Sequence, residues 1–181
     1  MKEQPTLTTE RLILRPYSLA DAKELQTLIG DRRISDTMHS IPHPYSVGMA
    51  EEWISMRQKS FDEGKSVQFL ITDKPNGFLI GGIGLTISKE DENAELGYWI
   101  GKPYWHKGYC SEAGAAVMKY GFEVLALNRI CARHMTRNPR SGKVMQKIGL
   151  QHEGHLRQAW KKWDKFEDVE MYAILRCDVI L

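Results

Sequence analysis

Cysteine is scarce in this sequence, and the three that occur lie far apart. Cys110, Cys131 and Cys177 are odd in number and form no C-x-x-C pair. A disulfide scaffold or a structural zinc site would need an even set or closely spaced thiols, so neither is expected. Reduced thiols are typical of the cytoplasm, and we therefore expect a cytoplasmic protein.

Long apolar runs are also missing. No stretch of 18 apolar residues occurs, and the chain starts with Met-Lys-Glu-Gln-Pro rather than with an apolar signal region. A membrane-spanning helix needs a longer apolar stretch than any found here. The sequence therefore predicts no signal peptide, no membrane span and no membrane partner.

An excess of charge of one sign is absent as well. The 25 Lys and Arg residues nearly balance the 23 Asp and Glu residues, which gives a net charge of +2. A dedicated nucleic-acid-binding protein would carry a strongly basic face, so direct nucleic-acid binding is not expected. A length of 181 residues suffices for one buried core, and no repeat or low-complexity linker divides it. We expect a single domain over residues 1–181.

The pattern of apolar residues predicts a mixed α/β fold with the element order βααβββαβαββ. Ser18 is expected to cap the first helix, with Asp21 completing a capping box. The segment 31–45 is expected to be irregular. Strands are predicted at 7–16, 67–72, 78–87, 94–100, 129–135, 150–159 and 168–175, and further helices at 46–63, 111–127 and 141–148.

The loop between strand 94–100 and helix 111–127 predicts an anion site. It is rich in glycine and aromatic residues, and Ser111 is the expected N-cap of the helix. Main-chain N–H groups at a helix N-terminus have no intrahelical partner and lie at the positive end of the helix dipole. The expected ligand is therefore a phosphate or pyrophosphate. Neither the P-loop pattern nor the dinucleotide pattern G-x-G-x-x-G occurs in the chain.

The same loop resembles the pyrophosphate loop of the GNAT acetyltransferases, whose pattern is [QR]-x-x-G-x-[GA]. Six residues, Trp105 to Cys110, align with that pattern, and Gly108 matches it. Trp105 stands where the family has Gln or Arg, and Cys110 stands where it has Gly or Ala. In that family main-chain amides hold the phosphates, so Cys110 is compatible with binding if its thiol points away.

Five segments in register across the chain resemble the GNAT branch that includes the ribosomal-protein N-terminal acetyltransferases. The resemblance implies a GNAT fold: a single mixed, mostly antiparallel sheet of about seven strands with four helices. Its fourth and fifth strands would splay apart at the acetyl-CoA site. The matching segments are 9–16, 94–100, 127–130, 138–150 and 153–157.

The resemblance also implies roles for residues at matching positions. Main-chain groups of Trp99 and Ile100 would bind the pantetheine arm of CoA, and Asn138 would contact the same arm. Ser141 would place a hydroxyl near the CoA sulfur, and Glu95 would be the general base. The pyrophosphate would be held by amides of His106, Lys107, Gly108, Tyr109, Cys110 and Ser111.

These residues also have plainer interpretations. Glu95 could be a salt-bridged carboxylate, Ser141 a helix N-cap and Asn138 a turn former. Cys110 is expected to pack rather than act as a nucleophile, because no His–carboxylate arrangement is evident nearby. His152 and His155 have the spacing of a metal-ligand pair. Residues three apart on a strand face opposite sides, however, so metal binding is not expected.

Together these features predict an acetyl-CoA-dependent N-acetyltransferase that transfers acetyl directly from the thioester to a primary amine, without a metal. A protein or peptide N-terminal α-amine is the expected acceptor. Segment 156–166 carries four cations against one carboxylate, which would suit an acidic peptide if those side chains face the cleft; they are Arg157, Lys161, Lys162 and Lys165.

Two other functions stay open. One is acetylation of a small-molecule amine such as a polyamine, an antibiotic or an amino acid. The other is a catalytically silent acyl-CoA-binding regulatory protein, which the departures at Trp105 and Cys110 allow. The protein is expected to be a monomer or a homodimer.

Overall fold

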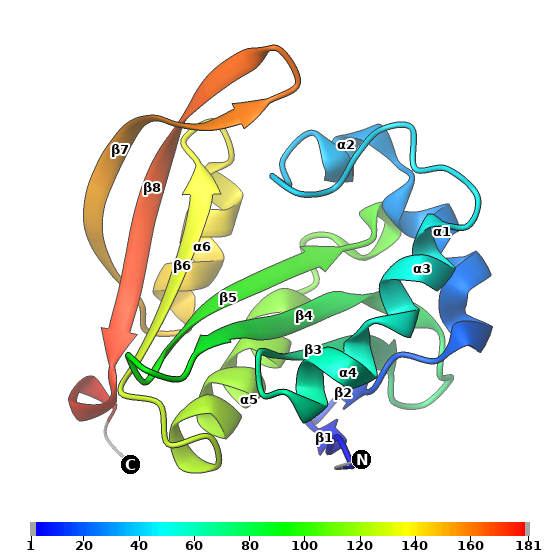
Figure 1. The fold of residues 1–181 in the computed structure, drawn as a ribbon, viewed down its shortest axis with the longest axis horizontal. Helices are drawn as coiled ribbons and strands as arrows, with labels where there is room; N and C mark the ends of the chain where they lie inside the picture. The colour runs from blue at the N-terminus through cyan, green and yellow to red at the C-terminus, as the bar shows by residue number, and fades with distance from the viewer. Residues whose placement is uncertain (1–2, 180–181) are drawn as a thin grey trace.

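One sheet with helices on both faces makes up the computed structural model, which describes residues 3–179 (Figure 1). The strand order is β1-β2-β3-β4-β5-β6-β8-β7. Neighbouring strands are antiparallel except β5 and β6, which are parallel. The strands are β1 Leu7–Thr8, β2 Leu12–Arg15, β3 Ser66–Asp73, β4 Leu79–Ser88, β5 Asn93–Ile100, β6 Arg129–Met135, β7 Gln151–Lys162 and β8 Lys165–Leu175.

The expected single, mostly antiparallel sheet is confirmed, with eight strands rather than about seven. Helices are more numerous than the four expected. Within residues 3–179 none of them is long and apolar enough to cross a membrane. They are α1 Ala22–Ile29, α2 Arg32–Ser35, α3 Met49–Ser55, α4 Arg57–Asp62, α5 Tyr109–Glu123 and α6 Pro139–Lys147, with 3-10 turns η1 Leu19–Asp21, η2 Lys102–Tyr104 and η3 Arg176–Asp178.

The N-terminal third differs most from expectation. Segment 7–16 is not one strand but a short hairpin, because Thr9 closes a turn with both its main chain and its hydroxyl bonded to Leu12. Segment 46–63 contains two helices, the first capped by Gly48 at φ 89°. The irregular segment 31–45 contains the short helix α2, capped by the Asp31 carboxylate. The capping box of Ser18 and Asp21 is confirmed, on η1 immediately before α1.

Two apolar layers hold the sheet between the helices. The main core joins α5 and α6 to one face of the sheet, and its members Val117, Met145 and Ile130 are almost fully buried. A smaller cluster joins α1 and α3 to the other face, around Leu25 and Ala50. Each face of the sheet is therefore apolar, as expected for a sheet covered on both sides.

The sheet opens between β5 and β6. These two strands pair over only three positions, 93–95 with 129–131, and then diverge (Figure 1). Beyond that point β5 stays paired with β4, and β6 stays paired with β8. The splay expected between the fourth and fifth long strands is thus present, and it lies directly before the loop that leads into α5.

Candidate active site

The N-terminus of α5 faces the splay and begins earlier than expected. Gly108 is the N-cap, in the left-handed conformation at φ 80°, and the helix starts at Tyr109. Only glycine adopts that conformation without steric cost. Ser111 is therefore not the N-cap that the sequence suggested, but a buried residue in the first turn. The N–H groups of residues 108–111 have no intrahelical partner, which leaves them available to an anion.

An ion pair between Glu112 and Arg11 holds this loop against the β1–β2 turn. Glu112 accepts hydrogen bonds from the Thr9 hydroxyl at 2.6 Å, the Arg11 N–H at 2.8 Å and Arg11 Nε at 2.7 Å. Arg11 also donates to the carbonyl of Lys107 at 3.0 Å and stacks over the ring of Tyr109. The negative charge of Glu112 is thereby matched at the β1–β2 turn.

Trp105 ties the loop to the end of β5. Its indole N–H donates to the carbonyl oxygen of Ile100 at 2.6 Å. Lys102 and Arg140 approach its ring at 5.0 and 6.0 Å. The Trp that replaces the family's Gln or Arg therefore has a structural contact in this protein.

The main chain of β5 presents alternate residues to the splay. Gly101 N–H donates to the carbonyl of Ile80, and the strand register pairs Gly82 with Trp99. In an antiparallel pair the bonding direction alternates, so main-chain groups of Trp99 face β4 and those of Tyr98 and Ile100 face the splay. Of the two residues predicted to bind the pantetheine arm through the main chain, Ile100 faces the splay and Trp99 faces β4.

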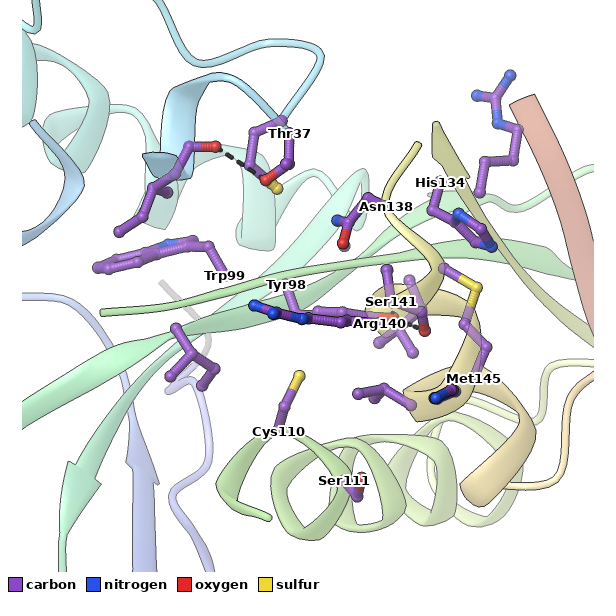
Figure 2. A pocket seen from close by; sticks show the side chains of 18 of the residues that line it. Thr37, Tyr98, Trp99, Cys110, Ser111, His134, Asn138, Arg140, Ser141 and Met145 are labelled. Atoms are coloured by element: carbon purple, nitrogen blue, oxygen red, sulfur yellow. Dashed lines mark hydrogen bonds between the residues drawn. The ribbon is translucent and has the colours of Figure 1, made fainter. Parts of the chain in front are cut away.

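Two hydroxyls from β5 and α6 meet inside the splay. Tyr98 Oη donates to the main-chain oxygen of Ser141 at 3.0 Å, and the Ser141 hydroxyl lies 2.8 Å from it (Figure 2). Burial raises the pKa of Tyr98 above its ordinary value, so the phenol stays protonated. Ser141 lies in the first turn of α6, whose N-cap is Asn138, so N-capping does not explain the serine.

Glu95 lies at the base of the splay, at the last position where β5 pairs with β6. Its two oxygens accept hydrogen bonds from Arg133 Nε at 2.9 Å and Nη2 at 2.7 Å. This bidentate pair keeps the carboxylate oriented. The salt-bridged interpretation of Glu95 is therefore correct, and it leaves a catalytic role open.

Asn138 and Cys110 complete the inner surface of the splay. The Asn138 side chain makes no capping hydrogen bond and points from the start of α6 toward the space between α2 and β5 (Figure 2). The Cys110 sulfur points from α5 toward Tyr98 (Figure 2). Burial raises the pKa of the Cys110 thiol to about 12, which keeps it protonated at neutral pH. Packing therefore describes this cysteine better than nucleophilic attack.

All the expected site residues except Lys107 line one cavity of about 1090 Å³. Side-chain contacts cross this cavity on the side away from α5. Lys162, only 4% exposed, lies at the end of β7 in the β7–β8 hairpin and donates to the carbonyls of Met38 and Ile41 at 2.7 and 2.6 Å. Arg137 pairs with Asp36 at 2.7 Å across the same gap.

The hairpin cations do not line the cavity as expected. Lys162 is bonded to main-chain carbonyls, and its pKa is lowered by burial. Arg157, Lys161 and Lys165 are absent from the described residues that line the cavity. The charge argument drawn from segment 156–166 required these side chains to face the cleft, and none of the four is among the residues within 3–179 that line the cavity.

The His152 and His155 side chains lie on the same side of β7, not on opposite sides. A register irregularity between His152 and Gly154 changes the alternation. Both imidazoles contact Glu170, at 2.7 and 2.8 Å, and His155 also lies 3.3 Å from Asp168. The described residues contain no group of three side chains arranged to hold a metal ion.

Tyr98 and Arg133 are the site residues that the sequence did not single out. Tyr98 was visible within the segment 94–100, but its partner Ser141 is 43 residues away. Arg133 reaches Glu95 only because β5 and β6 run parallel at that level. The sequence held a weak signal for Arg133, because Arg129 and Arg133 lie on one face of β6.

Comparison with known protein families matches residues 11–151 of this chain to the family described as acetyltransferase (GNAT) domain. This range begins at Arg11 behind the loop and ends at the first residue of β7. It therefore includes the splay, the α5 N-terminus and the Tyr98–Ser141 pair.

Two relatives cover most of the chain. A Bacillus licheniformis protein named uncharacterized N-acetyltransferase p20 is 36% identical over 94% of this chain and 96% of its own length. The Escherichia coli protein named [ribosomal protein uS5]-alanine N-acetyltransferase is 27% identical over 82% of this chain and 79% of its own.

Solved structures share the fold. A GNAT-family acetyltransferase from Bacillus anthracis has a TM-score of 0.85 at 25% identity, covering 95% of this chain and 99% of that one. The ribosomal L7/L12 alpha-N-protein acetyltransferase RimL in complex with coenzyme A scores 0.87 at 18% identity, covering 94% and 98%. Spermidine N-acetyltransferase from Vibrio cholerae, in complex with CoA and spermine, scores 0.81 at 23% identity, covering 94% and 98%.

The last two structures are less than 25% identical and bear on the fold alone. The family match extends over more than half of the chain, and the relative at 36% identity covers nearly all of it. The splayed strands and the α5 N-terminus, which has no side-chain cap, agree with that assignment. This chain therefore belongs to the GNAT acetyltransferase family and is an acetyl-CoA-dependent N-acetyltransferase.

Proposed function

We propose that this enzyme acetylates the N-terminal α-amine of a protein or peptide. One observation carries the proposal: the charge of the cavity. Its lining contains five Lys or Arg side chains and, among the described residues, one carboxylate, Glu95, which is already bonded to Arg133. Such a cavity repels a polyamine, whereas an α-amine titrates near 7.7 and is partly neutral at pH 7.

The name of the Escherichia coli relative supports the same acceptor class, because that protein is named for an alanine N-terminus of a ribosomal protein. The bridge over the cavity also fits a chain end. Lys162 and Arg137 join the β7–β8 hairpin and β6 to the segment after α2, so the cavity is crossed on that side, and a chain end needs less open space than the middle of a chain.

Different residues of this chain would bind the pyrophosphate and the pantetheine arm of acetyl-CoA. The N–H groups of residues 108–111 would hold the pyrophosphate of acetyl-CoA at the start of α5. His106 and Lys107 would supply further amides from the same loop. Asn138 and the N–H of Ile100 would contact the pantetheine arm, since both face the splay.

The chemical step needs a proton acceptor and a proton donor. The thioester supplies an activated acetyl group, the amine nitrogen bonds to its carbonyl carbon, and the bond to sulfur breaks. Glu95 would take the amine proton, directly or through water. Ser141, bonded to Tyr98, would donate a proton to the departing thiolate and regain one from solvent, while Glu95 releases the amine proton to solvent, so both groups return to their starting states. A main-chain N–H of β5 in the splay would stabilise the negative charge that develops on oxygen.

The test is the rate of acetyl transfer to three acceptors at matched ionic strength. The first is a peptide with a free α-amine and no lysine, the second is the same peptide with its α-amine blocked, and the third is spermidine. We expect the highest kcat/KM for the free peptide and no turnover for the blocked one. A higher kcat/KM for spermidine would overturn the proposal.

A small-molecule amine is the second candidate acceptor. Spermidine is included in the test because the fold is similar to that of a spermidine N-acetyltransferase. Turnover of small amines without turnover of any peptide would select it. Binding of acetyl-CoA without turnover on any amine would instead indicate an acyl-CoA-binding regulatory protein.

A further inference from the structure

A second cavity, of about 490 Å³, lies on the face of the sheet that carries α1 and α3. It adjoins the first cavity, because several residues line both, among them Gln68, Thr86, Gly97 and Trp99. Residues two apart on a strand share a face, so Gly97 and Trp99 follow Glu95 on the same side of β5. The second cavity therefore opens next to the predicted general base.

Bare main chain forms the floor where the two cavities meet. Gly97 of β5 lies directly opposite Gly84 of β4. A Cβ atom at Gly97 would meet nothing within 4 Å, so the space above it is open. A Cβ atom at Gly84 would lie 2.3 Å from Gln68 Oε1, and one at Gly82 would lie 2.1 Å from Tyr17 Oη. The glycines of β4 thus leave room for the polar ends of Gln68 and Tyr17 against the sheet. Gly97, which has no side chain, leaves an open passage between the two cavities.

Aromatic rings form the walls of the second cavity. Tyr17 packs its edge against Trp53 at 4.8 Å between ring centroids, and Arg57 lies 4.3 Å over the same Trp53 ring. Tyr45 and Trp99 add two more rings. Interlocked rings of this kind give a preformed surface that binds apolar and aromatic groups.

The charge of the second cavity disfavours a cationic ligand. Arg57 lines it, with its guanidinium over the Trp53 ring. Glu52 is the only acidic side chain of the described lining, and it is exposed to solvent. A polyamine would therefore place its second ammonium beside the Arg57 guanidinium, with only an exposed carboxylate in the lining.

We propose that this second cavity binds the side group next to the acceptor amine, and that the group is apolar and about the size of a Phe or Met side chain. The inference rests on the proposed function and deepens it. The amine lies beside Glu95, and its neighbouring group passes over Gly97, away from α5, into the aromatic walls. A cavity of this volume is within the range that binds small ligands.

The first experiment compares peptides that differ only in their first residue, Phe, Met or Ala, at saturating acetyl-CoA. Burial of the larger side chain predicts a kcat/KM about ten- to a hundredfold higher for the Phe and Met peptides than for the Ala peptide. An N-terminally blocked Phe peptide is the control for the α-amine. 2-Phenylethylamine carries the same group without a peptide chain, and spermidine provides a cationic comparison.

The second experiment closes the passage. Gly97→Val adds a branched side chain above the floor and should lower the Phe-to-Ala ratio of kcat/KM toward one, with acetyl-CoA binding retained in calorimetry. Gly154→Val is the matched control, because Gly154 is also a strand glycine whose Cβ would meet nothing within 4 Å and it lines neither cavity. Met56→Trp, at a rim position that is 49% exposed, fills the cavity without altering the sheet.

The outcomes separate the two proposals. Equal rates for Phe and Ala peptides, or unchanged ratios in both Gly97→Val and Met56→Trp, overturn the side-group site and leave α-amine acetylation standing. Rapid turnover of 2-phenylethylamine without turnover of peptides supports the side-group site and refutes the peptide acceptor. Preference for spermidine, or no turnover on any amine, refutes both.

Discussion

Substitution of Gly108 by Glu tests the phosphate site most directly. Gly108 has φ 80° at the N-cap of α5, and a Cβ atom there would lie 3.5 Å from Arg11 Nη2, an ordinary contact. The fold can therefore accept a side chain, at the cost of placing a non-glycine residue in the left-handed region. That cost is about 1–2 kcal/mol. For a domain of this length it corresponds to a fall in Tm of roughly 2–8 °C.

The informative quantity is the rise in Tm that acetyl-CoA produces. A ligand at a hundred times its Kd stabilises the native state by about 2.7 kcal/mol. For a domain of this length we expect a rise of roughly 5–11 °C in the unmodified protein. Gly108→Glu should abolish the rise, because its carboxylate would stand among the N–H groups that we propose to hold the pyrophosphate.

Gly108→Ala is the control, since it carries the same backbone strain without the charge. Both variants should lose similar intrinsic stability, but the Ala variant should keep most of the ligand-dependent rise. The assay is thermal unfolding followed by fluorescence or circular dichroism, over a series of acetyl-CoA concentrations. A full rise in the Glu variant would place the pyrophosphate elsewhere and refute the reasoning.

Three further predictions concern side chains. Glu95→Gln should lower kcat by about a hundredfold or more while acetyl-CoA binding, measured by calorimetry, is retained. Tyr98→Phe should lower kcat by about tenfold or more through its effect on Ser141. It should also cost about 1 kcal/mol of unfolding free energy in urea, because the Ser141 oxygen loses its donor. Hydrogen bonding to Glu170 raises the pKa of His155, so its contribution to stability is complete below its unfolded pKa and is lost as pH rises through the folded value. His155→Gln should therefore reduce the fall in Tm between pH 6 and pH 8.

Each of these predictions has a contradicting result. Equal loss of acetyl-CoA binding and turnover in Glu95→Gln would return that carboxylate to a structural role. Unchanged kcat in Tyr98→Phe would remove the tyrosine from the proton path. His152, Asp168 and Glu170 face His155, and hydrogen bonds lower the pKa of Glu170 to about 2. The lowered pKa of Glu170 stabilises the protein above the unfolded pKa of Glu170, and this stabilisation is lost only in acid. It therefore does not contribute to the change in Tm between pH 6 and pH 8. If His155→Gln leaves that change in Tm unaltered, the role given to His155 is wrong.

From β3 onward, local patterns predicted the order of the strands and α-helices, because apolar periodicity and turn residues are read within a few neighbours. Strand 129–135 was predicted with the bounds that the structure has. The start of α5 was misplaced by two residues, since Ser111 is a good N-cap by composition but Gly108 supplies the left-handed turn. Residue type alone does not reveal which of two nearby caps the chain uses.

The sequence did not reveal which residues contact one another across the sheet. Glu95 and Arg133 are 38 residues apart and meet only through the parallel contact of β5 with β6. The irregularity after His152 likewise depends on how β7 pairs with β8, and it reversed the expected side of the second histidine. Long-range register, rather than residue type, decides such contacts.

The bridge over the splay is made by side chains rather than by the sheet. Arg137 pairs with Asp36, and Lys162 donates to the carbonyls of Met38 and Ile41, which joins β6 and the β7–β8 hairpin to the segment after α2. β5 and β6 pair only at residues 93–95 with 129–131. The width of the cavity on this side therefore depends on contacts between segments far apart in the chain, and a change in either segment would alter the space left for an acceptor.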